Sequence, residues 1–136
     1  MSKIIGFISL FAAFAIAAPV TLNYYSFVNS TFQGRFEKLW HRDISLLRDK
    51  RLLPKEWESI SNIEYSAPTP SSHQWLEDTR PPLSINKNGE YSLEVVITDW
   101  KQDEDVHVII QYNLIHNQSG NMIWELGRTF NLGKAR

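Results

Sequence analysis

The residues best suited to metal chemistry are four carboxylates close together, Asp99, Asp103, Glu104 and Asp105. Several carboxylate oxygens from one short loop are the ligands that calcium prefers. Their spacing does not match an EF-hand loop, and acidic residues between two predicted strands are typical of a solvated turn. We therefore predict no metal site in this chain.

The histidines offer no recognisable catalytic arrangement. His107 and His116 fall in one predicted strand an odd number of positions apart, so their side chains are expected on opposite faces. The chain has no cysteine, and it has no glycine-rich phosphate loop or nucleophile elbow. We predict no catalytic residue, no cofactor and a protein that is not an enzyme.

Aromatic side chains are the first candidates for binding. Tryptophan and tyrosine are favoured anchors of protein interfaces. Trp57, Trp75 and Trp100 fall in or beside predicted loops, and we predict that they are exposed contact residues. The alternative is that Trp75, with Leu76 beside it, packs into the core and holds its loop down.

Basic side chains are the second candidates. Residues 35–55 contain seven basic residues and three acidic ones, a local charge of +4. Arg35 and Arg42 are the candidates to contact anionic lipid headgroups, a cell-wall polymer or an acidic partner. The interleaved acidic residues also fit an ordinary helix surface with mixed charge.

The first 17 residues have the features of an export signal. Lys3 precedes the apolar run from Ile4 to Ile16, and Ala15-Ile16-Ala17 is the small-x-small pattern that signal peptidase cleaves after. The run is shorter than the roughly 20 apolar residues that span a bilayer. We predict cleavage after Ala17 and a periplasmic or secreted protein; the alternative is an uncleaved membrane anchor.

Length and composition indicate one globular domain over residues 18–136. The chain has 136 residues, 43% of them hydrophobic, and a formal net charge of −1. A nearly neutral chain has no overall field that attracts nucleic acid, so we predict no nucleic-acid partner. Asn29 and Asn117 begin sequons that a eukaryotic pathway could glycosylate.

Hydrophobic periodicity predicts an α+β domain in which an antiparallel sheet packs on one amphipathic helix. The helix is expected over residues 32–50, and Ser30 with Gln33 fits a capping box at its start. The other expected elements are a strand at 20–28, a short helix at 54–59, an extended stretch at 63–65, a Pro-rich loop at 67–90 and a three-stranded meander within 91–132.

The hairpin from Tyr112 to Trp124, YNLIHNQSGNMIW, resembles a segment of bacterial envelope proteins. It is similar to hairpins in curli-secretion channel proteins, penicillin-binding-protein activators and transporter auxiliary lipoproteins. The resemblance covers roughly residues 91–132 and implies an α+β domain that assembles with or regulates envelope machinery without being an enzyme. Those families usually carry a lipid-modified cysteine, which this chain lacks.

These observations favour an exported, non-catalytic binding or assembly module with a protein partner in the envelope or the extracellular space. In this interpretation the chain meets a membrane only through an uncleaved N-terminal segment. One alternative is a secreted carbohydrate-binding protein or hydrolase that uses loop carboxylates such as Glu77 and Asp78. Another is a membrane-anchored subunit of an envelope complex.

Overall fold

The computed structural model describes residues 30–134. The predicted export signal at 1–17, the predicted strand at 20–28 and the sequon residue Asn29 lie outside the described residues. The fold and the candidate sites below are therefore those of residues 30–134.

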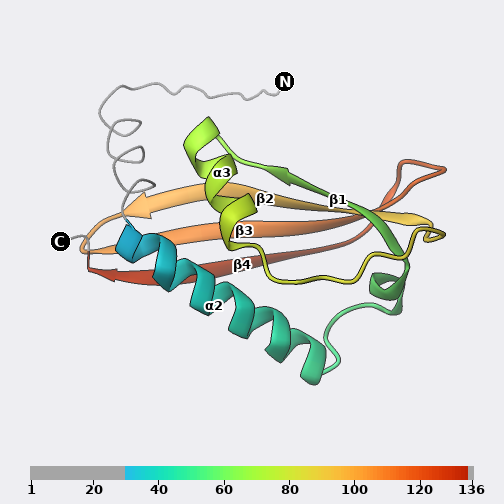
Figure 1. The fold of residues 1–136 in the computed structure, drawn as a ribbon, viewed down its shortest axis with the longest axis horizontal. Helices are drawn as coiled ribbons and strands as arrows, with labels where there is room; N and C mark the ends of the chain where they lie inside the picture. The colour runs from blue at the N-terminus through green and yellow to red at the C-terminus, as the bar shows by residue number, and fades with distance from the viewer. Residues whose placement is uncertain (1–29, 135–136) are drawn as a thin grey trace.

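Within these residues one four-stranded sheet carries two α-helices on the same face (Figure 1). The α+β class predicted from the sequence is confirmed. The elements in chain order are α2 (Ser30–Asp49), the 3₁₀ helix η1 (Lys55–Ser59), β1 (Ile60–Ser66), α3 (Pro70–Thr79), β2 (Tyr91–Gln102), β3 (Asp105–His116) and β4 (Met122–Lys134).

The predicted meander is present, because β2 pairs antiparallel with β3 and β3 pairs antiparallel with β4. The predicted antiparallel sheet holds for β2 to β4 and is wrong for β1, which is the first strand in the order β1-β2-β3-β4 and pairs parallel with β2. Parallel neighbours need a crossover of a dozen residues or more, and the segment 67–90 supplies it.

Helix α2 covers the sheet as its apolar spacing predicted. The structure describes it from Ser30 to Asp49, and the predicted capping box of Ser30 with Gln33 is not tested, because the residues before Ser30 lie outside the described ones. Its inner stripe is at most 5% exposed, and each fully buried large side chain of this kind contributes about 1.5–3 kcal/mol. The stripe consists of Phe32, Phe36, Trp40, Ile44 and Leu47.

The segment 67–90 is not the continuous loop that its prolines suggested, because α3 lies within it. Thr69 caps this helix: its Oγ1 accepts the N–H of Ser72 at 3.1 Å, and Ser72 Oγ accepts the N–H of Thr69 at 3.1 Å. Pro70 occupies the first turn, where proline is well tolerated because an N–H at that position would have no acceptor within the helix. The helix buries Trp75 and Leu76 against the sheet and α2.

Two polar contacts join α2 to the sheet. Trp40 Nε1 donates to the hydroxyl of Tyr112 at 2.8 Å. One turn further on, Arg128 of β4 donates to both carboxylate oxygens of Asp43, at 2.8 and 2.5 Å. The hydrogen bonds that Arg128 donates to Asp43 raise the pKa of the Arg128 guanidinium. The two contacts fix where α2 lies over β3 and β4 and which side of the helix faces these strands.

Tyr112 makes the stability of this fold depend on pH. Burial raises the pKa of its hydroxyl well above the ordinary value of 10. The folded protein therefore favours the neutral phenol, and this stabilisation is fully present below pH 10 and is lost as the pH rises above it.

We predict that Tyr112→Phe lowers stability at neutral pH by about 1 kcal/mol, because Trp40 loses its acceptor. Above pH 10 the free energy of unfolding of the variant should fall less steeply than that of the wild type. Urea unfolding at neutral pH and above pH 10 measures both effects, with the partly exposed Tyr91→Phe as the matched control. Parallel curves for wild type and Tyr112→Phe would contradict the assignment.

Candidate functional site

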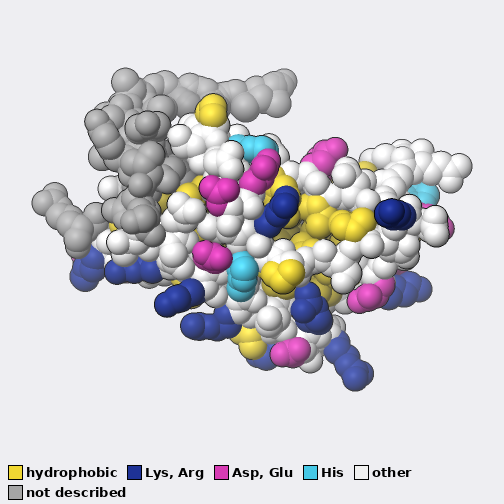
Figure 2. All heavy atoms as spheres, in the orientation of Figure 1, with side chains coloured by type: hydrophobic (Ala, Val, Ile, Leu, Met, Phe, Trp, Pro, Cys, Tyr) yellow, Lys and Arg dark blue, Asp and Glu magenta, His cyan; other side chains and the backbone are white. Residues whose placement is uncertain are grey.

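A cleft of about 620 Å³ lies between β1 and the segment that follows α3. Figure 2 shows hydrophobic side chains gathered on this part of the surface. The volume is in the range typical of ligand sites. Its lining combines apolar and polar side chains from two parts of the chain: Ser61, Asn62, Ile63 and Tyr65 on β1, then Arg80, Pro81, Pro82, Leu83 and Ile85.

The backbone edge of β1 faces this cleft. Ser61, Asn62 and Ile63 all line it, although successive side chains of a strand point to opposite faces. β1 ends the sheet. At its start the carbonyl of Ile60 accepts the N–H of Asn86 at 2.8 Å, and the outer N–H and C=O groups of the rest of β1 have no neighbouring strand within residues 30–134. The opposite wall contains Pro81 and Pro82, which have no N–H to donate and so cannot pair with β1 as a strand. The arrangement can accept an extended segment from another chain.

A cation stands at the end of the cleft near α3. The Arg80 guanidinium carbon lies 6.0 Å from the ring centroid of Tyr65, a cation–π distance. Burial raises the pKa of the Tyr65 hydroxyl, and the charge of Arg80 opposes that rise. Arg80 is exposed, so its charge is available to a ligand carboxylate at this end.

A second hollow, which we call the basic groove, lies between α2 and the end of β4. Its volume is about 290 Å³, and its lining is Arg35, Lys38, Leu39 and Arg42 of α2 with Asn131, Leu132 and Gly133 of β4. Three cations thus surround an apolar floor. The structure brings the two predicted binding residues Arg35 and Arg42 together here and adds Lys38 between them.

Arg35 is held in place within the groove. Its Nη1 donates to the carbonyl of Leu132 at 2.7 Å, and its guanidinium carbon lies 6.0 Å from the ring centroid of Phe32. Gly133 makes this approach possible, because a Cβ at that position would stand 2.7 Å from Nη1 of Arg35. Gly133 also has a φ of +94°, a conformation that suits glycine.

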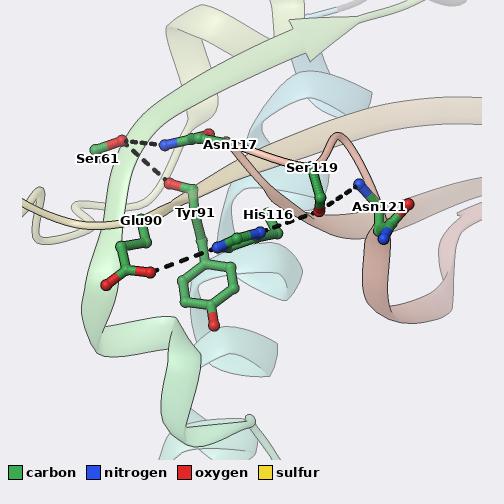
Figure 3. Close-up of polar contacts among 7 residues, drawn as sticks. All are labelled: Ser61, Glu90, Tyr91, His116, Asn117, Ser119 and Asn121. Atoms are coloured by element: carbon green, nitrogen blue, oxygen red, sulfur yellow. Dashed lines mark hydrogen bonds and ion pairs between the residues drawn. The ribbon is translucent and has the colours of Figure 1, made fainter.

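A polar cluster joins the ends of β1, β2 and β3 (Figure 3). His116 Nδ1 lies 3.0 Å from Ser119 Oγ, and His116 Nε2 lies 3.4 Å from a carboxylate oxygen of Glu90. Ser119, His116 and Glu90 are thus connected in the order of a serine–histidine–acid triad. In such a triad the acid that orients the imidazole is buried, whereas the side chain of Glu90 is 75% exposed. Ser119 Oγ also accepts the N–H of Asn121 at 3.2 Å, as a turn residue does.

The same cluster fastens the edge strand. Asn117, the asparagine of the second sequon, donates from Nδ2 to Ser61 Oγ at 3.1 Å, and Ser61 donates to the carbonyl of Tyr91 at 3.2 Å. These contacts tie the turn after β3 to β1 and β2. No sequence pattern indicated the cluster, since Glu90 and Ser61 are far from His116 along the chain.

The three tryptophans predicted as exposed anchors are buried, so that prediction is wrong. Trp57 is 8% exposed, Trp75 2% and Trp100 7%. Trp75 stacks on Phe36 at 4.7 Å between ring centroids and meets Trp100 edge-on at 5.6 Å. Trp57 packs edge-on against Tyr112 at 6.0 Å. The alternative considered for Trp75, a core residue that holds its segment down, is the observed one.

For Trp75 the signal for burial was present in the sequence, whereas for Trp100 the cause is visible only in the structure. Ser72, Trp75 and Leu76 have the three- and four-residue spacing of one helix face, which a loop assignment disregards. Trp100 reaches the core because the pairing of β2 with β3 has a register shift between Ile97 and Asp99. From Leu93 to Ile97 the odd-numbered side chains of β2 are buried, and after the shift the even-numbered Trp100 is buried instead.

The carboxylates considered from the sequence do not assemble into a site. Within residues 30–134 no three histidine or acidic side chains are placed to hold a metal ion. Glu77 and Asp78 contact neighbours on their own helix, His73 at 3.4 Å and Gln74 at 2.8 Å. Neither of them lines the β1 cleft.

Over the part of the chain that the structure describes, neither helix combines the length and the apolar character needed to cross a membrane.

No family model matches the chain, and no curated protein matches it. Among solved structures, the chain is similar to the PelC dodecamer from Paraburkholderia phytofirmans at 15% identity and a TM-score of 0.41, over 60% of this chain and 75% of that chain. It is similar to protein XCC0632 from Xanthomonas campestris at 13% identity and a TM-score of 0.39, over 54% and 66% of the two chains.

A third structure is lipoprotein GNA1162 from Neisseria meningitidis, at 12% identity and a TM-score of 0.31, over 54% of this chain and 83% of that chain. Likenesses this weak identify neither a family nor a function. None of the three is described as a curli-secretion, penicillin-binding-protein activator or transporter auxiliary protein, so that resemblance of the hairpin stays a prediction.

We predict that Gly133→Ala destabilises the protein by about 1–3 kcal/mol, because it combines a strained φ with a clash against Arg35. Gly120→Ala is the matched control, since Gly120 has a φ of +74° but no atom within 4 Å of the added Cβ. Urea unfolding of both variants separates the two causes. Equal losses would show that the contact with Arg35 contributes nothing.

Proposed function

We propose that this chain is an exported, non-catalytic binding module of the periplasm or cell envelope that takes an extended segment of a protein partner into the β1 cleft. The observation that carries the proposal is the open edge of β1 facing a wall whose Pro81 and Pro82 cannot pair with it. Addition of a strand to an exposed sheet edge is a recurrent mode of peptide recognition.

The lining of the cleft favours peptide as the ligand. Backbone groups of β1 would supply hydrogen bonds, while Ile63, Tyr65 and Leu83 would contact alternate side chains of the bound segment. Arg80 at one end favours a segment with an acidic residue there. The lining contains no carboxylate, whereas a glycoside hydrolase would need two.

The location and the absence of catalysis in this proposal rest on different grounds. The location rests on the leader pattern of residues 1–17 in the sequence. The non-catalytic role rests on the exposed position of the His116 cluster, where Glu90 is in water and Ser119 serves a turn.

Site-specific photocrosslinking in the producing cell tests the proposal. A photoreactive amino acid at Asn62, in the cleft, should capture a partner protein, whereas the same group at Gln118, in the exposed turn after β3, should not. The captured peptide, identified by mass spectrometry, should be an extended segment with an acidic residue.

Leu83→Arg should abolish the adduct at Asn62, because it places a long charged side chain in the cleft. Asn88→Arg, in the exposed turn before β2, is the matched control and should leave the adduct unchanged. Thermal unfolding of both variants establishes that they are folded. An adduct at Asn62 that survives Leu83→Arg, or equal adducts at Asn62 and Gln118, would refute binding in this cleft.

A further inference from the structure

We propose that the basic groove, together with the neighbouring Leu46, docks the folded domain on an anionic lipid surface. This inference is independent of the β1 cleft. Of the three kinds of target considered for Arg35 and Arg42 from the sequence, it commits to lipid headgroups, and it departs from the interpretation in which the chain meets a membrane only through its N-terminal segment. The contact now lies on α2, within the folded domain.

The residues of α2 that flank β4 form an amphiphilic line. Arg35 and Arg42 are seven residues apart, as are Leu39 and Leu46, so the two pairs follow neighbouring tracks on one side of the helix. Leu39 lies in the floor of the groove, and Leu46 continues the track with 44% of its surface exposed. The side of α2 next to β4 therefore offers cations and leucines together.

The charge of residues 35–55, from which the groove takes Arg35, Lys38 and Arg42, is less balanced than the sequence suggested. Of the three acidic residues within 35–55, Asp43 is turned inward and neutralised by Arg128, which leaves Glu37 and Asp49 against seven basic residues. Figure 2 shows Lys and Arg side chains along the α2 side of the molecule. A field of this sign attracts the anionic headgroups of a bilayer.

The combination favours a lipid surface over a soluble acidic protein. Long basic side chains place their alkyl stems on apolar material and their charges in the headgroup layer. Arg35 is pre-oriented for such a contact, because one of its donors is fixed on Leu132 and a guanidinium carries five. An exposed leucine beside the cations adds nothing to the binding of an acidic polymer, whereas it can enter the headgroup boundary.

Vesicle co-sedimentation of the full chain tests this inference. Phosphatidylcholine vesicles with about one third phosphatidylglycerol should bind the protein more tightly than pure phosphatidylcholine, at about 0.1 M salt, where surface charges still act over about 10 Å. The double variant Arg35→Gln/Arg42→Gln should lose about 25-fold in binding, since each cation near an anionic surface is worth about fivefold.

Lys87→Gln/Lys101→Gln is the matched control, because it removes the same charge from exposed positions outside the groove and should bind like the wild type. Leu46→Asn should weaken binding without changing the charge, with Ile123→Asn on the β4 hairpin as its control. All variants keep the same N-terminal segment, so their differences report on the folded domain.

Three results would overturn the inference. The first is equal binding to neutral and anionic vesicles, and the second is unchanged binding of the Arg35/Arg42 variant. The third is binding of soluble polyglutamate without vesicle binding, which would assign the groove to an acidic protein instead. Leu83→Arg should bind vesicles like the wild type, so failure of the cleft proposal and failure of this one remain distinguishable.

Discussion

The fold depends on how α2 is seated across β3 and β4. Its inner stripe is almost fully buried, and the contacts of Trp40 with Tyr112 and of Asp43 with Arg128 leave it one orientation. A helix fixed in this way must present its other residues at fixed places. The buried stripe thereby determines that Arg35 and Arg42 lie beside the end of β4, where the basic groove forms.

The cleft at the β1 edge of the sheet results from the crossover between β1 and β2. Parallel pairing requires the chain to return across the sheet, and α3 with the segment after it fills that path. The prolines at 81 and 82 let this segment pass close to β1 without becoming a fifth strand. The cleft is therefore a direct result of the topology and of two residues that lack an N–H.

The sequence predicted the elements better than the surfaces. Apolar spacing located α2 and the meander, because local periodicity reports which face is buried. It failed for Trp75, where prolines concealed a capped helix, and for Trp100, where the bulge after Ile97 resets the alternation. The β1 cleft was beyond reach, since Tyr65 and Arg80 meet only through the crossover. Arg35 and Arg42 could be predicted to lie close together because both lie on one helix, seven residues apart.

The strand order also decides how the two surfaces can work together. The cleft belongs to β1 and the groove to β4, so they occupy opposite edges of one sheet with β2 and β3 between them. At the usual strand spacing the two edges are about 14 Å apart. A peptide along β1 would therefore not cover the cations beside β4. A domain resting on lipid through α2 would keep its β1 edge open, which suits a module that holds a partner segment at a membrane surface.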